Sequence, residues 1–161
     1  MNLFDFAMKM ELDGKAYYEK LAAETPLTGL KNIFLSLARD EQKHYDAVSR
    51  MKSGAGPAMA ETAVLGEAKN LFEGLMTQQS VVSGLRKDLQ GYEHAMKIEA
   101  DSIRFYEDMA AKETHPETVQ LLLKIAAEER KHYDIMENLY TFVQAPENYL
   151  AWGEFSNLKE F

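Results

Sequence analysis

Two short segments of the sequence carry a glutamate and a histidine three residues apart. Residues 40–46 read DEQKHYD and residues 128–134 read EERKHYD, so Glu41 and His44 recur as Glu129 and His132. In a helix this spacing places the two side chains about 60° apart around the axis and one turn along it. A carboxylate oxygen and an imidazole nitrogen can then bind the same metal ion. A single Glu-x-x-His pair is common by chance, so its position in the helices decides whether it is significant.

The repeat extends well beyond these two segments. A shift of 88 residues, which takes Glu41 to Glu129, also aligns MELDGKAYYEKLA at 10–22 with IEADSIRFYEDMA at 98–110. The second half of the chain therefore repeats the first, as expected for a duplicated structural unit.

Four long stretches have the apolar periodicity of amphipathic helices and contain few Pro or Gly residues. We predict helices at about 2–24, 28–52, 85–113 and 117–143. The breaks at TPLTG and THPE are short enough to make each pair of helices an antiparallel hairpin. Residues 53–84 would form a long crossover, with a short additional helix in EAKNLFEGLMTQQ. The sequence thus predicts an all-α fold, an antiparallel four-helix bundle made of two repeated hairpins.

Ionisable residues interrupt the apolar face of each predicted helix. Apolar residues spaced alternately by three and four mark the buried face. Six positions on these faces are ionisable: Glu11, Glu41, His44, Glu99, Glu129 and His132. Four ionised and unpaired carboxylates in a core would cost on the order of several kcal/mol each. No Lys or Arg shares these faces, whereas two divalent cations would balance the charge.

The types of ligand narrow the choice of metal. Carboxylates and imidazoles without a thiolate suit iron or manganese, and zinc could bind without redox activity. One Glu from each of two helices and a Glu-x-x-His from each of two others is the ligand set of di-iron carboxylate bundles. The alternative is an inert bundle, in which the glutamates bend outward to water and the histidines are hydrogen-bonded in the core.

These motifs resemble those of the rubrerythrin group of the ferritin-like superfamily along all four predicted helices. The resemblance implies a non-haem di-iron centre, in which Mn or Zn could substitute for Fe. It implies bridging carboxylates at Glu41 and Glu129 and terminal carboxylates at Glu11 and Glu99, with one imidazole each from His44 and His132. It also suggests Tyr18 and Tyr106 as hydrogen-bond donors or redox-active phenols near the metals, although aromatic core residues would look the same.

Other residues near these motifs have less specific interpretations. We interpret Gly14 and Ser102 as space for a small oxidant beside the metals, although close helix packing would also explain them. We expect two further pairs to lie outside the metal site: Asp40 and Glu128 as surface charges, and His94 and His115 as solvated side chains. The aromatic tail, residues 144–161, is expected to pack on the bundle or on a second subunit.

Composition limits the remaining functional classes. The 161 residues are 46% hydrophobic, which suits one domain over 1–161, and the net charge of −8 argues against nucleic acid and anionic membranes as partners. The chain contains no cysteine, which excludes disulfides and thiolate-bound metals and is compatible with the cytoplasmic location that we expect. No apolar run approaches the roughly 20 residues that cross a bilayer, and the N-terminus does not resemble a signal peptide.

From the resemblance we expect a di-iron oxidoreductase of the peroxidase or ferroxidase type that reduces hydrogen peroxide or dioxygen in oxidative-stress defence. Typical rubrerythrins carry a cysteine-bound rubredoxin centre after the bundle, so here a separate electron-donor protein such as a rubredoxin would be needed. They also commonly have an extra carboxylate where this chain has Ser102. We expect a homodimer. The alternatives are a ferroxidase or iron-storage protein and a non-catalytic scaffold that binds zinc or no metal.

Overall fold

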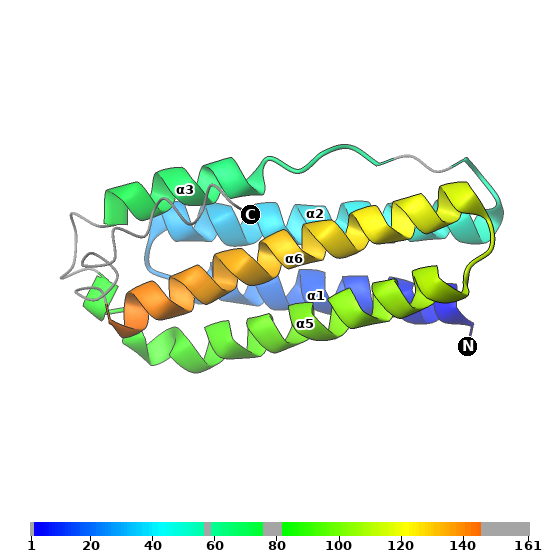
Figure 1. The fold of residues 1–161 in the computed structure, drawn as a ribbon. Helices are drawn as coiled ribbons and strands as arrows, with labels where there is room; N and C mark the ends of the chain where they lie inside the picture. The colour runs from blue at the N-terminus through cyan, green and yellow to red at the C-terminus, as the bar shows by residue number, and fades with distance from the viewer. Residues whose placement is uncertain (1, 57–58, 76–81, 146–161) are drawn as a thin grey trace.

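The computed structural model describes residues 2–56, 59–75 and 82–145, and the regular secondary structure within them is all helical. Four long helices form the bundle, namely α1 (Leu3–Glu24), α2 (Thr28–Ser53), α5 (Leu89–Lys112) and α6 (Pro116–Gln144). A shorter helix, α3 (Val64–Leu75), lies in the crossover and packs along the outside of α2 (Figure 1). Helix α1 pairs with α2, and α5 pairs with α6. The predicted all-α bundle of two hairpins joined by a long crossover is confirmed.

The ends of the helices follow from local residue chemistry. The side chain of Asn2 accepts a hydrogen bond of 2.9 Å from the amide of Asp5 and caps α1. Helix α2 ends at Gly54, whose φ of 82° lies in the left-handed region that glycine adopts without strain. Pro116 opens α6 in its first turn, as predicted. Helix α5 begins later than predicted because Arg86–Asp88 forms a 3₁₀ turn, a common way for a helix to start.

The buried interior has two apolar clusters separated by a polar layer. One cluster includes Phe34 and Leu37 of α2 and Tyr92 of α5, and α3 contributes to it, with Phe72 stacked on Phe142 at 6.4 Å between ring centroids. The other includes Val48 of α2 and Leu122 of α6. Because both clusters are apolar and close-packed, they hold the side chains of the layer between them in place.

Some sequence predictions concern residues that the structure does not describe. Most of the aromatic tail, residues 146–161, lies outside the described residues, as do residues 76–81 at the end of the predicted short helix. Among the described residues, no helix is both long enough and apolar enough to cross a membrane.

Candidate metal centre

The six ionisable residues predicted from the sequence meet in the polar layer at the middle of the bundle. Glu11 comes from α1, Glu99 from α5, and each Glu-x-x-His pair from α2 or α6. All six residues are buried, with exposures of at most 2%. A burial this complete contradicts the alternative in which the glutamates bend outward to water.

These residues form two groups that could each hold a metal ion. One group contains Glu11 and His44, the other contains Glu99 and His132, and both contain Glu41 and Glu129. Within each group the possible ligand atoms lie within 4.8 Å of one another. Two ions bound here would therefore share the two carboxylates that the groups have in common, while each would have its own glutamate and histidine.

Each histidine turns the same ring nitrogen toward the carboxylates. Nδ1 of His44 lies 3.0 Å from Oε1 of Glu129 and 3.4 Å from Oε1 of Glu11. Nδ1 of His132 lies 3.0 Å from Oε1 of Glu41. The two imidazole rings are stacked, with 5.8 Å between their centroids. Nδ1 is therefore the nitrogen that each ring offers to a metal ion.

The opposite ring nitrogens contact two carboxylates that the sequence prediction placed at the surface. Nε2 of His132 lies 2.9 Å from Oδ2 of Asp40, and Nε2 of His44 lies 2.8 Å from Oε1 of Glu128. Asp40 and Glu128 are only 8% and 2% exposed, so the prediction of surface charges is wrong. Each residue lies about 100° around its helix from the neighbouring glutamate, and α2 and α6 are close enough for that direction to face the other helix rather than water.

Further contacts hold these two carboxylates in place. Glu128 forms an ion pair of 3.0 Å with Lys43, and the hydroxyl of Thr62 in the crossover donates a hydrogen bond to Asp40. Although burial opposes it, the hydrogen bonds from His132 and Thr62 lower the pKa of Asp40 to about 2. Ionised Asp40 accepts the Nε2 proton of His132, which leaves the Nδ1 lone pair free for a cation. The sequence signal that could have revealed this pair is the repeat itself, because Asp40 and Glu128 are 88 residues apart and both acidic.

An Asp40→Asn variant should bind divalent metal about 10- to 100-fold more weakly, the usual effect of losing a carboxylate behind a histidine ligand. Asparagine keeps an acceptor oxygen but loses the charge that fixes the tautomer of His132. Competition against a chromophoric chelator measures the affinity for zinc. Asp46→Asn is the matched control, since Asp46 is exposed on the same helix. Equal affinities of the two variants would contradict the role assigned to Asp40.

Two buried tyrosines form hydrogen bonds between the hairpins. Each bonds to a glutamate that belongs to only one of the two groups. The hydroxyl of Tyr18 on α1 donates a hydrogen bond of 2.8 Å to Oε1 of Glu99 on α5. The hydroxyl of Tyr106 on α5 donates to Oε2 of Glu11 on α1. Burial raises the pKa of both phenols, so both remain protonated donors. Each hairpin thus orients a carboxylate of the other.

The electrostatics of the layer favour either protons or cations beside the carboxylates. Burial and the neighbouring Glu129 raise the pKa of Glu41, and the same two causes raise the pKa of Glu99 to about 7. Although burial opposes it, the carboxylates of Glu99 and Asp40 raise the pKa of His132 to about 10. Metal ions would displace these protons, because ligation requires the deprotonated forms.

Several buried oxygens in the layer also make no hydrogen bond within the described structure. Among them are both carboxylate oxygens of Glu129, Oε1 of Glu11 and Oε2 of Glu99. The contacts of Nδ1 of His44 with Glu129 and Glu11 are ion-pair contacts without hydrogen-bond geometry. Buried acceptors without donors are costly, and these oxygens border the positions where the two groups would hold ions. The donor set therefore fits a pair of divalent cations.

The remaining residues singled out in the sequence lie at or away from this layer. Ser102 is buried, and a Cβ added to Gly14 would lie 2.9 Å from Oε2 of Glu41. His94 and His115 are exposed, as predicted, and the ring of His94 packs edge-on against Tyr17 at 5.0 Å between centroids.

Comparison with known proteins identifies one family. Residues 2–140 match the family model described as Rubrerythrin. No curated protein and no solved structure matches the chain.

Proposed function

The chain belongs to the rubrerythrin family, which implies a di-iron site, and from this premise we propose that it reduces hydrogen peroxide at a pair of iron ions. The observation that carries the proposal is the pair of overlapping four-residue groups, completely buried and related by the internal repeat. Dioxygen is the alternative oxidant. A separate protein would supply the electrons, since the chain has no cysteine to hold an iron–sulfur centre of its own.

The roles of the residues follow from their places in the two groups. Glu41 and Glu129 would be shared by the two ions, because both groups contain them. Glu11 and His44 complete one coordination set, and the corresponding residues of the second repeat, Glu99 and His132, complete the other. The four carboxylates of the two groups would balance the charge of two ferrous ions in the low-dielectric interior.

The protein contributes orientation of the ligands to the reaction. When bound, the metal pair supplies two electrons at adjacent positions, so the O–O bond of a peroxide can be reduced to two water molecules with two protons and without release of a radical. Tyr18 and Tyr106 hold the terminal glutamates through their hydroxyls. Asp40 and Glu128 fix the imidazoles, and the apolar clusters cover the layer on either side along the bundle.

Anaerobic loading with ferrous iron, followed by one equivalent of peroxide, tests the proposal. We expect a ferric absorption band to develop at least about tenfold faster than in a Glu41→Ala variant, which lacks a bridging ligand. The same experiment with dioxygen ranks the two oxidants. If wild type and variant oxidise iron at the same rate, the proposal is wrong.

The two alternatives predict different outcomes in simple measurements. A ferroxidase or storage protein would react with dioxygen in preference to peroxide and would elute from size-exclusion chromatography as a large shell rather than the dimer that we propose. A scaffold would contain less than about one metal ion per chain by elemental analysis when purified without chelator.

A further inference from the structure

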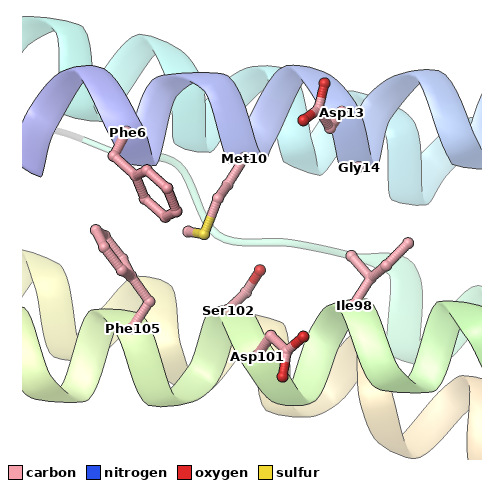
Figure 2. A pocket seen from close by; sticks show the side chains of 8 residues that line it. All are labelled: Phe6, Met10, Asp13, Gly14, Ile98, Asp101, Ser102 and Phe105. Atoms are coloured by element: carbon pink, nitrogen blue, oxygen red, sulfur yellow. The ribbon is translucent and has the colours of Figure 1, made fainter. Parts of the chain in front are cut away.

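A cavity of about 350 Å³ lies between α1 and α5 (Figure 2). One residue of its lining, Gly14, lies against Glu41 of the candidate metal centre. Its walls are largely apolar, with Phe6 and Met10 on α1 and Ile98 and Phe105 on α5. The two phenylalanine rings are in contact at one end of the cavity, with centroids 5.1 Å apart. The cavity is large enough for several molecules the size of water or peroxide.

The lining of the cavity follows the internal repeat. Gly14 and Ser102 are 88 residues apart in the sequence, and so are Asp13 and Asp101, and all four residues line the cavity. Met10 and Ile98 form a third such pair. The cavity therefore lies where the two hairpins meet, and six of its eight lining residues form pairs related by the repeat.

One of the two smallest residues in the lining lies directly against a shared carboxylate. A Cβ at Gly14 would lie 2.9 Å from Oε2 of Glu41, closer than real Cβ atoms approach other atoms. Gly14 thus contacts a proposed bridging ligand and also lines the cavity. Ser102 supplies the other small side chain and is 5% exposed. A larger side chain at either position would fill the space beside the centre.

The charges around the cavity favour a neutral molecule over a cation. The two acidic residues in the lining each have a basic partner: Asp13 pairs with Lys9 at 2.8 Å, and Asp101 with Arg104 at 2.6 Å. The rest of the lining includes the apolar side chains of Met10 and Ile98. An ion would lose its hydration along such walls at a high cost, whereas a small uncharged molecule would not.

We propose that this cavity is the access route by which a small uncharged oxidant, hydrogen peroxide or dioxygen, reaches the metal pair. Gly14 and Ser102 keep the route open through their small size. The inference rests on the proposed function for the identity of the molecule, but the route itself can be tested without metal or turnover.

The absence of cysteine from the chain makes a clean accessibility experiment possible. In the full chain freed of metal, a single Ser102→Cys variant is treated with ethyl methanethiosulfonate or with its cationic aminoethyl analogue. Ala110→Cys is the matched control, because Ala110 lies on the same helix, is also 5% exposed, and belongs to the apolar core. Each rate is divided by that of Ala111→Cys, an exposed position that corrects for the reagents' own reactivity.

We expect the neutral reagent to modify Ser102→Cys at least about tenfold faster than Ala110→Cys, because access governs the reaction of a buried thiol. The normalised rate of the cationic reagent at Ser102→Cys should be clearly lower. Equal rates at the two buried thiols would overturn the proposed route. A faster cationic reagent would overturn its preference for uncharged molecules and indicate a path for metal ions.

A second variant connects the route with the reaction. Ser102→Leu should slow oxidation of the loaded iron by peroxide about tenfold or more while metal content per chain stays at the wild-type value. Ala111→Leu is the control, and an unchanged rate in Ser102→Leu would contradict the proposal. If wild-type protein does not react with peroxide at all, the proposed function fails, and the thiol experiment still decides whether the route exists.

Discussion

A Glu129→Gln variant should lose the metal pair and, in the metal-free state, be more stable than the wild type. Glu129 belongs to both candidate groups, so its replacement removes a ligand from each ion. Its side chain is fully buried between carboxylates that it repels, Glu41 and Glu99, and neither of its oxygens makes a hydrogen bond in the described structure, although Nδ1 of His44 lies 3.0 Å from Oε1. The residue therefore destabilises the empty bundle and is retained, on this interpretation, for binding metal.

The two effects of this variant have separate magnitudes. Glutamine removes a negative charge that repels Glu41 and Glu99, and its amide can donate to those carboxylates. The free energy of unfolding of the metal-free protein should rise by about 1–3 kcal/mol. Metal content after loading should fall from two ions per chain to less than one. Urea denaturation in the presence of chelator measures the first quantity, and elemental analysis measures the second.

A Glu11→Gln variant separates the loss of a bridging ligand from the loss of a terminal one. Glu11 belongs to only one group, so one ion per chain should remain bound. Retention of two ions by Glu129→Gln would show that Glu129 does not bridge. Loss of both ions from Glu11→Gln would show that the two positions fill only together.

The bundle and its polar layer could be predicted from the sequence because both follow from the helical spacing of apolar and ionisable residues. The spacing of apolar residues by three and four gives the direction of each side chain relative to its own helix axis, and Glu41 and Glu129 fall on the buried side. The repeat then indicates that the six ionisable residues belong to one site. Both signals can be read from a single helix or from a comparison of the two halves of the sequence.

The residues next to this layer could not be predicted in the same way. The side chains of Asp40 and Glu128 point about 100° around the helix axis from the buried glutamates. On an isolated helix that direction faces solvent, but in this bundle it faces the neighbouring helix. Whether a side chain at that angle is buried depends on how α2 and α6 approach each other and on Thr62 in the crossover. The spacing of residues within one helix gives no information on the approach of the two helices or on the position of Thr62. The cavity beside Gly14 is similar, since small residues are compatible with either space or close packing until the second helix is placed.

Removing the metal should lower the melting temperature by on the order of 15–30 °C. Each ion present at about a thousandfold excess over its dissociation constant stabilises the fold by about 4 kcal/mol, and 1 kcal/mol corresponds to roughly 2–4 °C for a chain of this size. Calorimetry of chelator-treated and zinc-loaded protein measures the difference. The Glu129→Gln variant should show almost none, whereas a similar melting temperature for the two wild-type forms would rule out a structural role for the ions.

This difference should widen as the pH rises. Burial and Glu129 raise the pKa of Glu99 to about 7, and nearby carboxylates raise the pKa of His132 to about 10 against the effect of burial. Both pKa values lie above those of the unfolded chain, near 4.5 and 6.5. The stability from these bound protons is complete below the unfolded values and is lost between pH 4.5 and 7 for Glu99 and between 6.5 and 10 for His132. Metal-free protein should therefore melt at a higher temperature at pH 5.5 than at pH 8.5.

Metal binding needs the deprotonated ligands, so metal affinity should rise with pH. A difference in melting temperature between metal-free and metal-loaded protein that stays constant across this pH range would contradict the proposed exchange of protons for metal ions.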